Sequence, residues 1–374
     1  MCPAENSQHP VRAELDGLRH LADTTSVAAL RDGSWLVPFL DHALGEYADA
    51  NDHDAVRGRW PDLDLDGVAD ARIDTAQRHA ALAGGLSAAG YASVVMVALA
   101  SGGLASAVAL PTAVGAFALD TYYTARVQLR LGWDLAVLYQ RRFDLDDPRQ
   151  ASVLAKVAFG LDTDRSLQEM AGRFAPEASR LTTRAATTAV RLATGRGLRT
   201  VGQQLVARNL AKFAMPAIGV PLCAGVNHYT TGVVGAQVKR VFRGQALASE
   251  LAEELAQGPA DPTILVDTIL MLVQADGRVR AAETTLMREL LDTYTEGGQG
   301  LEPPIDVDVP GVLARIRATE PALQRRLYSA AVAAVALDGT LHSAEDNLLR
   351  EVAAAAGVVY DPRVVTTAIV QARD

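Results

Sequence analysis

Two stretches in the C-terminal part of the chain carry the same acidic residues at the same spacing. Asp276 and Asp338 each precede a glycine, and Glu283 and Glu345 follow them seven residues later. Carboxylate oxygens are the ligands that hard divalent cations such as Ca²⁺ and Mg²⁺ prefer. Each turn alone offers too few ligands, but two turns brought together could supply four carboxylates to one ion. The doubled pattern therefore indicates a candidate divalent-cation site.

The same residues have a purely architectural interpretation. Asp can end a helix, Gly permits the left-handed turn that follows, and a Glu near the start of the next helix is favoured by the helix dipole. Apolar helices precede both Asp-Gly pairs and new helices follow them, so the predicted unit is helix, tight turn, helix, packed in tandem with pseudo-two-fold symmetry. In the second copy, Ser343 and Asp346 have the spacing of a capping box. Both interpretations are open on the sequence alone.

A third acidic run opens like a calcium loop. Residues 62–74, DLDLDGVADARID, contain the Asp-x-Asp-x-Asp-Gly start of such a loop. Its twelfth position is Ile73, where a bidentate Glu is required, so the strongest ligand is missing. We therefore favour a polar turn with a helix N-cap over calcium here.

No familiar catalytic signature is present in the sequence. The chain lacks a P-loop, a glycine fingerprint after a strand, and the Gly-x-Ser-x-Gly and His-Glu-x-x-His motifs. Its two cysteines, Cys2 and Cys223, lie far apart, which argues against a disulfide framework or zinc cluster and favours a reducing compartment. Residues 1–16 carry charges where a signal peptide would have its apolar run. We therefore expect a non-enzymatic cytoplasmic protein.

The net charge of −9 hides a basic block. From residue 178 to residue 249 there is no Asp or Glu, whereas ten Arg and Lys residues occur. Such a block is typical of binding to an anionic partner, but it can equally pair with acidic surfaces of the same protein. The block is poor in aromatic residues for base stacking, which disfavours nucleic acid. The candidate membrane- or anion-binding residues are Arg180, Arg184, Arg191, Arg208 and Lys212.

Residues 80–119 carry no charge at all. The pattern predicts two apolar helices joined by a turn at Ser101–Gly103, the second of them broken by Pro111. The first arm just reaches the roughly 20 residues that a membrane-spanning helix needs, but its many Ala, Gly and Ser residues contribute little to insertion. Basic residues flank both ends, so an inserted hairpin would keep both ends cytoplasmic. The alternative is a close-packed hairpin buried inside the protein.

The chain as a whole is predicted to be all-α, because strand signals are scarce and Ala, Leu, Arg and Glu dominate. We expect a helical bundle with an apolar Ala/Gly-rich helical hairpin, and a second compact helical domain with an internal repeat. A strongly amphipathic helix should run from residue 120 to about Phe143. The expected divisions are an N-terminal helical segment at 1–75, a hairpin-containing domain at 76–250, a linker at 251–262 and an acidic domain at 263–374.

A second uncharged stretch occupies residues 213–238. It contains a Pro-x-x-Gly motif at Pro216 and Gly219 and a Gly-x-Asn motif at Gly225 and Asn227. Its prolines and glycines predict an interrupted helix pair. Asn227 lies at the polar centre of the stretch, where it could hydrogen-bond between helices.

These features together resemble a bacterial family. Residues 70–247 resemble the EcsC family in the order of their features. An uncharged hairpin comes first, followed by the segment VQLRLGWDLAVLYQRRFDLDDP, a basic helix, and the Pro-x-x-Gly and Gly-x-Asn motifs. That family commonly has Tyr-Gly after the long helix, whereas here Tyr139 is followed by Gln140. The resemblance implies a membrane-peripheral role and no particular chemistry.

The doubled Asp-Gly unit resembles the TerB-like domain, whose DGxhxxxE repeats recur in tellurite-resistance and DnaJ-related proteins. The resemblance covers about residues 262–370, and the matching positions are Asp276, Glu283, Asp338 and Glu345. It implies a compact acidic helical module that binds metal ions or partner proteins near the membrane.

We therefore expect a cytoplasmic protein peripheral to the cytoplasmic membrane. Its basic helices would dock on anionic lipid, with on the order of 1 kcal/mol from each basic residue, and its hairpin would then insert. The acidic module would bind a divalent cation or an unknown protein partner. The alternative is a fully soluble helical scaffold with the hairpins as its core, whose acidic module docks on the basic block of its own chain or of a neighbour in a homo-oligomer.

Overall fold

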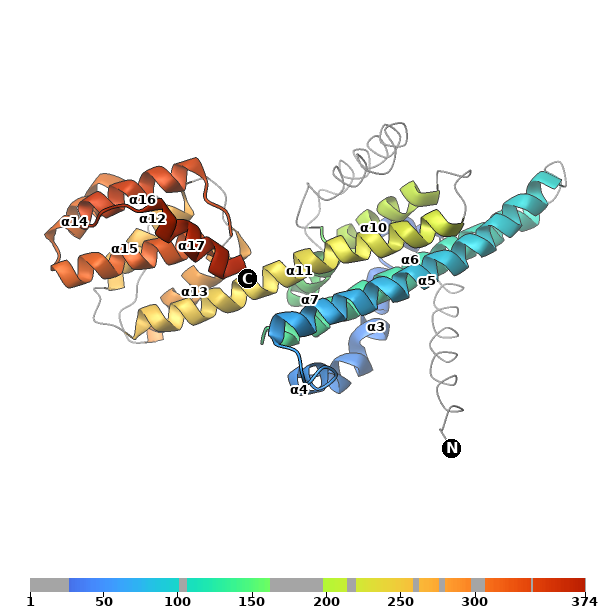
Figure 1. The fold of residues 1–374 in the computed structure, drawn as a ribbon. Helices are drawn as coiled ribbons and strands as arrows, with labels where there is room; N and C mark the ends of the chain where they lie inside the picture. Colours follow the sequence, from blue (N-terminus) through green and yellow to red (C-terminus); the bar gives the residue numbers. More distant parts are fainter. Residues whose placement is uncertain are drawn as a thin grey trace. The chain divides into compact units, whose positions relative to one another are not determined.

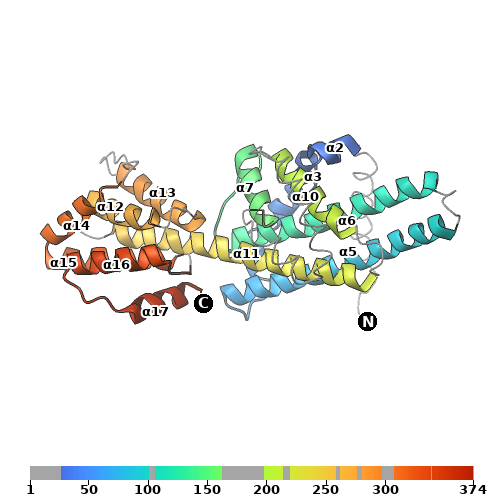
Figure 2. The ribbon, with the colours of Figure 1, turned by 90° about the horizontal axis from the view of Figure 1, so that it is seen from above.

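The computed structural model describes residues 27–100, 106–161, 198–213, 220–257, 262–275, 280–296, 307–337 and 339–373 (Figures 1 and 2). The side chains of residues 86–119 and 207–223 lie outside this description. Every regular element within the described ranges is a helix, which confirms the all-α class. The chain divides into two compact units, Met1–Lys239 and Arg240–Asp374, and each is considered by itself.

Unit 1 is organised around a long helical hairpin. Its two arms, α5 (Leu65–Ala100) and α6 (Ser106–Leu138), lie side by side, as the uncharged sequence predicted (Figures 1 and 2). The predicted turn at Ser101–Gly103 lies outside the described residues, and Pro111 falls inside α6. The remaining helices of the unit are α2 (Val27–Asp32), α3 (Leu36–Ala50), α4 (His53–Arg57), α7 (Pro148–Ala158), α10 (Leu198–Phe213) and the first part of α11 (Val220–Ala256).

The N-terminal helices are part of the same core as the hairpin. Trp35, Phe39 and Tyr122 form an aromatic cluster with ring centroids 5.0–5.4 Å apart, and all three side chains are buried. Aromatic rings bury large apolar areas, so this cluster fastens α3 firmly to α6. Helix α5 also runs through residue 75, where we expected the N-terminal segment to end. The described part of that segment, residues 27–75, therefore packs with the hairpin.

A buried polar cluster also joins α3, α5 and α6. Asp134 is fully buried, and its carboxylate accepts hydrogen bonds from the Tyr47 hydroxyl at 2.7 and 2.9 Å and from Nε of Arg72 at 2.5 Å. Burial and the charge of Asp134 raise the pKa of Tyr47. Burial alone would lower the pKa of Arg72. The charges of Asp134 and Tyr47 and their hydrogen bonds to Arg72 have a larger, opposite effect, so the pKa of Arg72 lies above its usual value. A buried carboxylate persists only with such partners.

Helix α6 ends earlier than predicted, at Leu138 rather than near Phe143. Gln140 has a positive φ of 56°, and the N–H groups of Gln140 and Arg141 donate to the carbonyls of Val137 and Ala136. This is a Schellman motif, which stops the helix because the residue after the cap is left-handed. Glycine is the residue that adopts this conformation without strain, so Gln140 stands where a glycine would fit better.

Helix α11 is continuous from Val220, so the proline and glycines from that residue onwards do not interrupt it as we predicted, while Pro216 and Gly219 lie outside the described residues. The glycines serve close packing instead. A Cβ on Gly235 would lie 2.9 Å from Ile73 and 3.1 Å from Leu131, so a side chain there would push α11 away from α5 and α6. Asn227 is buried and its amide donates to Asp120 at 3.4 Å, which fits the predicted interhelical hydrogen bond.

Unit 2 contains the repeated acidic unit and has a core of its own. Its helices are the rest of α11, α12 (Pro262–Val273), α13 (Ala281–Glu296), α14 (Val309–Ala318), α15 (Pro321–Ala336), α16 (Ser343–Ala355) and α17 (Pro362–Arg373). The first helices of the two copies, α12 and α15, pack against each other, as pseudo-two-fold packing requires. Ala248, Ala252 and Leu255 belong to this core, so the division falls at Lys239 and not in the expected linker at 251–262.

The Asp134 cluster predicts a large effect of one substitution. Asp134→Asn keeps the shape but leaves the Arg72 cation buried without its carboxylate, so we expect the free energy of unfolding to fall by about 3 kcal/mol. Asp74→Asn is the matched control, because its pair with Arg78 is exposed and should contribute less than about 1 kcal/mol. Urea unfolding of both variants measures this, and equal effects would show that the Asp134 cluster is not needed.

The left-handed turn after α6 predicts a stabilising substitution. Gln140→Gly should raise the free energy of unfolding by up to about 1 kcal/mol, because it relieves the positive φ. Gly357, which follows α16 with a φ of 64° and open space around its Cβ position, provides the reverse experiment. Gly357→Ala should destabilise by about 1 kcal/mol through the backbone alone. Denaturant unfolding checks both signs, and a destabilised Gln140→Gly variant would contradict the argument.

Candidate functional site

The two repeat glutamates lie close to one guanidinium in unit 2. Glu283 in α13 and Glu345 in α16 are 3% and 2% exposed, which is unusual for this residue type. The other two predicted metal ligands, Asp276 and Asp338, lie outside the described residues. Half of the predicted set can therefore be placed, and those two carboxylates come together at the junction of the copies.

Each glutamate caps the start of its own helix. Oε2 of Glu283 accepts the backbone N–H of Arg280 at 2.6 Å, and Oε2 of Glu345 accepts the backbone N–H of His342 at 2.8 Å. Such bonds satisfy donors that a helix start leaves without an intrahelical acceptor. The capping box predicted for Ser343 and Asp346 thus forms one residue earlier, because α16 begins at Ser343 and its cap is His342.

The second oxygen of each glutamate faces the same cation. Nη1 of Arg280 lies 3.6 Å from Oε1 of Glu283 and 3.9 Å from Oε1 of Glu345. Nη2 of Arg280 lies 2.7 Å from Nε2 of His342, which also lies 3.4 Å from the hydroxyl of Thr340. Arg280 and His342 occupy equivalent positions in the two copies, three residues before their glutamates. The cluster therefore sits where the two turns meet.

The donors in this cluster do not fit a divalent cation by themselves. One oxygen of each glutamate is engaged by a backbone N–H, and the other faces a guanidinium that already carries positive charge. Ca²⁺ and Mg²⁺ require six or more oxygen ligands. Among the described residues, no group of three or more His, Cys, Asp and Glu side chains is arranged to hold a metal ion.

The second copy carries a further polar cluster that the first copy lacks. The Tyr360 hydroxyl donates to Asp346, and the Arg350 guanidinium lies 4.3 Å from the centre of the Tyr360 ring and 2.9 Å from Asp346. The hydrogen bond from Tyr360 lowers the pKa of Asp346. Burial acts in the opposite direction, and the hydrogen bond and charge of Arg350 lower the pKa further. Burial, followed by the hydrogen bond and charge of Asp346, raises the pKa of Tyr360 to about 12. This cluster ties α16 to the segment before α17.

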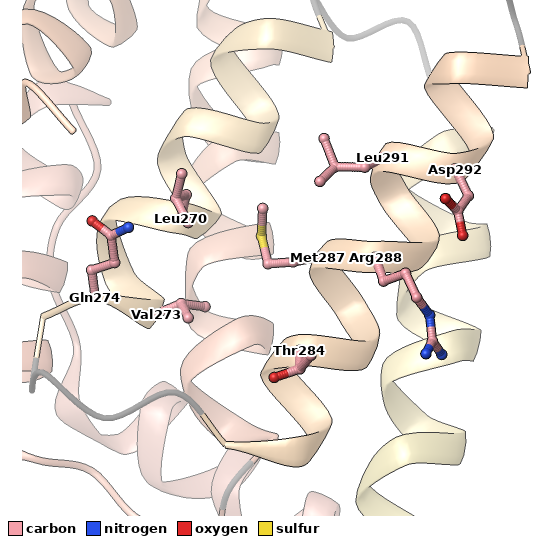
Figure 3. Close-up of a pocket in the computed structure, with 8 residues that line it drawn as sticks. All are labelled: Leu270, Val273, Gln274, Thr284, Met287, Arg288, Leu291 and Asp292. Carbon is pink, nitrogen blue, oxygen red and sulfur yellow. The ribbon is translucent and has the colours of Figure 1, made fainter. Parts of the chain in front are cut away.

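At the equivalent place in the first copy there is an open groove between α12 and α13 (Figure 3). Thr284 and Arg288 stand there at the positions of Asp346 and Arg350. The groove has a volume of about 370 Å³, and Figure 3 shows Met287 extending from α13 towards α12. Its lining is mainly apolar, with a polar rim, and consists of Leu270, Val273, Gln274, Thr284, Met287, Arg288, Leu291 and Asp292.

The acidic run at 62–74 is a helix start, as we favoured. Oδ1 of Asp64 accepts the N–H of Gly67 at 2.8 Å at the beginning of α5. Asp66 accepts a hydrogen bond from the Tyr139 hydroxyl at 2.5 Å, and Nζ of Lys239 lies 2.8 Å from Asp70 and 3.7 Å from Asp66. These carboxylates hold α6 and α11 against α5.

Most predicted anion-binding residues fall outside what the structure describes. Arg180, Arg184 and Arg191 are among the residues that it leaves out, as are Pro216 and Gly219. Arg208 and Lys212 lie in α10, but their side chains are not described. Gly225 is exposed on α11, while Asn227 is buried. The basic block as a membrane-binding surface therefore stays a prediction.

Sequence reasoning missed Arg280 and His342, the two residues that complete the cluster. Their signal was present, because both stand three residues before the repeat glutamate, where a helix cap belongs. The two copies share Asp-Gly and Glu, and the prediction used these identical residues. Positions 280 and 342 carry different residues, Arg and His. The junction between two copies can require different residues at equivalent places, because the side chains of Arg280 and His342 approach each other there.

Comparison with known proteins provides no family assignment. No family model, no curated protein and no solved structure matches this chain.

The Tyr360 cluster predicts a pH-dependent effect on stability. Tyr360→Phe removes the hydrogen bond that lowers the pKa of Asp346, so the variant should be less stable than wild type at neutral pH. Because the folded-state pKa lies below the unfolded value of 3.8, this contribution is present above that pH and is lost as the pH falls through the folded pKa. Thermal unfolding from pH 7 to pH 2 should show the two Tm values converging. A constant gap would contradict the linkage.

Proposed function

We propose that the protein is a non-enzymatic, membrane-associated protein whose uncharged hairpin engages the bilayer surface and whose acidic unit binds a partner protein. The observation that carries the proposal is the course of α5 and α6. Their distal ends extend together beyond α10 and α11 of the same unit (Figures 1 and 2). The part that extends falls within residues 80–119, which carry no charge.

The distribution of charge along the hairpin supports this proposal. In α5 the last charged residue is Arg78, and in α6 the first is Asp120, so both arms are uncharged from these residues to the turn. The base of the hairpin is built into the core, where Ala76, Ala80 and Tyr122 are fully buried. The hairpin thus has an anchored base and an uncharged end, which suits shallow association with lipid.

The base of the hairpin has a surface of mixed character. A shallow groove of about 560 Å³ lies between α5 and α11, with Leu82, Ala81 and Gly85 next to Arg78 and His228. Leu82 is 65% exposed. Apolar side chains beside basic groups are suited to the membrane interface, because the apolar side chains can contact the acyl chains while the basic groups stay near the anionic headgroups. No helix in the described part of the chain is long and apolar enough to cross a membrane.

The basic block supplies the electrostatic part of the proposal. Arg180, Arg184, Arg191, Arg208 and Lys212 would attract anionic lipid, with on the order of 1 kcal/mol from each residue near the surface. This attraction is reversible and weakens with salt. Membrane binding would then combine a charge-driven encounter with insertion of the uncharged end.

For the acidic unit we propose the partner role rather than the metal role. The groove between α12 and α13 offers an apolar floor and a polar rim, which is the usual anatomy of a protein-binding surface. The paired glutamates already face Arg280, so they offer little to a metal ion. The resemblances to EcsC and TerB-like proteins agree with both halves of this proposal.

The test is flotation of the purified protein with liposomes of graded anionic lipid content. Wild type should float with anionic vesicles, and Val97→Glu, which places a charge in the uncharged arm, should reduce the floating fraction at least about tenfold, since an acidic side chain at the bilayer is costly. Val153→Glu is the control, because Val153 is an apolar residue on α7 that is already 47% exposed. A variant with Arg180, Arg184 and Arg191 changed to Glu tests the electrostatic step.

Two outcomes would overturn the membrane proposal. If wild type does not float even at low salt, the soluble scaffold with the hairpins as core becomes the better account. If Val97→Glu and Val153→Glu float equally well, the hairpin is not the membrane-binding element. Circular dichroism of each variant separates loss of binding from loss of fold.

A further inference from the structure

We propose that Arg280 is the resident cation of the doubled acidic turn, so that the two copies are held together without a divalent ion. A divalent ion was one of two interpretations of the sequence pattern at this place, and the arrangement of the described residues favours an internal cation instead. This inference concerns unit 2 alone and does not depend on membrane binding.

The first support is the matched orientation of the two glutamates. In both copies Oε2 accepts a backbone N–H at the helix start, which leaves Oε1 to face the junction. Both Oε1 atoms then lie within 4 Å of one nitrogen, Nη1 of Arg280, at 3.6 and 3.9 Å. Buried carboxylates need a positive partner, and a single guanidinium provides it for both.

The second support is the difference between the two copies at this position. Two arginines at equivalent places would bring two cations to the same junction, where they would repel each other. The second copy has His342 instead, and its Nε2 lies 2.7 Å from Nη2 of Arg280. A guanidinium can only donate hydrogen bonds, so Nε2 is the acceptor in this contact. The histidine thereby orients the arginine at a place where a second arginine would repel it.

The third support is how deeply the three groups are enclosed. The side chains of Glu283 and Glu345 are 4% and 2% exposed, whereas that of Arg280 is 28% exposed. Arg280 is therefore the most accessible of the three side chains, and the two carboxylates lie deeper. A divalent ion approaching Glu283 and Glu345 would have to displace a cation that is already covalently part of the chain.

The experiment is thermal unfolding of the full chain, with a substitution that removes the charge and a matched control. Wild type should unfold at the same Tm in EDTA and in millimolar Mg²⁺ or Ca²⁺, and purified protein should contain no stoichiometric metal. Arg280→Gln should lower the Tm by at least about 5 °C, because two carboxylates stay buried without their cation. Arg288→Gln loses the same charge from an exposed side chain of α13, the helix that follows Arg280, and should change the Tm by less than about 2 °C.

A double-mutant cycle tests the pair directly. In a Glu345→Gln background the Arg280→Gln substitution should cost less than in wild type, since one carboxylate has already been neutralised. The proposal is overturned if EDTA lowers the Tm of wild type, if Mg²⁺ or Ca²⁺ raises it, or if Arg280→Gln and Arg288→Gln behave alike. The metal measurements use wild type only, so they decide the matter even if Arg280→Gln does not fold.

Discussion

Both units depend on the same constraint: a carboxylate taken out of water must keep a cation or several hydrogen-bond donors beside it. In unit 1 Asp134 is fully buried and is held by Arg72 and Tyr47. In unit 2 Glu283 and Glu345 are held by backbone N–H groups and by Arg280. Apolar residues fill the rest of both cores, and such residues pack closely but specify little direction. These polar clusters therefore fix which helices meet and in what register.

The two polar clusters differ in what they join. The Asp134 cluster connects helices with different sequences, so it contributes to a unique packing of α3 and α5 on α6. The Arg280 cluster connects two copies of one unit, so it must break the symmetry between them in order to hold a single cation. The Tyr360 cluster then adds a contact that only the second copy possesses. The first copy therefore has an open groove between α12 and α13, whereas in the second copy Tyr360 binds the segment before α17 to α16.

The fold class and the doubled unit could be predicted from the sequence, because helix periodicity and the Asp-Gly pairs are local signals. The hairpin and the helix start at Asp64 were predicted for the same reason. The end of α6 was misplaced because Gln140 adopts a conformation that its residue type does not announce. The continuity of α11 from Val220 was missed because the glycines of residues 213–238 were interpreted as breaks, whereas the approach of Ile73 and Leu131 to Gly235 requires a residue without a side chain there. Arg280 escaped notice because its role appears only when the two copies are placed together.

The order in which the contacts of unit 1 can form during synthesis follows from their separation along the sequence. Lys239 on α11 bonds to the carbonyl of Asp66 on α5, across 173 residues of sequence. Asn227 reaches Asp120 across 107 residues. The uncharged hairpin is therefore made long before the helix that covers its base, and the closure of such distant contacts is slow. A nascent chain with this arrangement carries the uncharged hairpin before the helix that packs on its base has been made, and such a partly covered hairpin is prone to aggregation until α11 arrives.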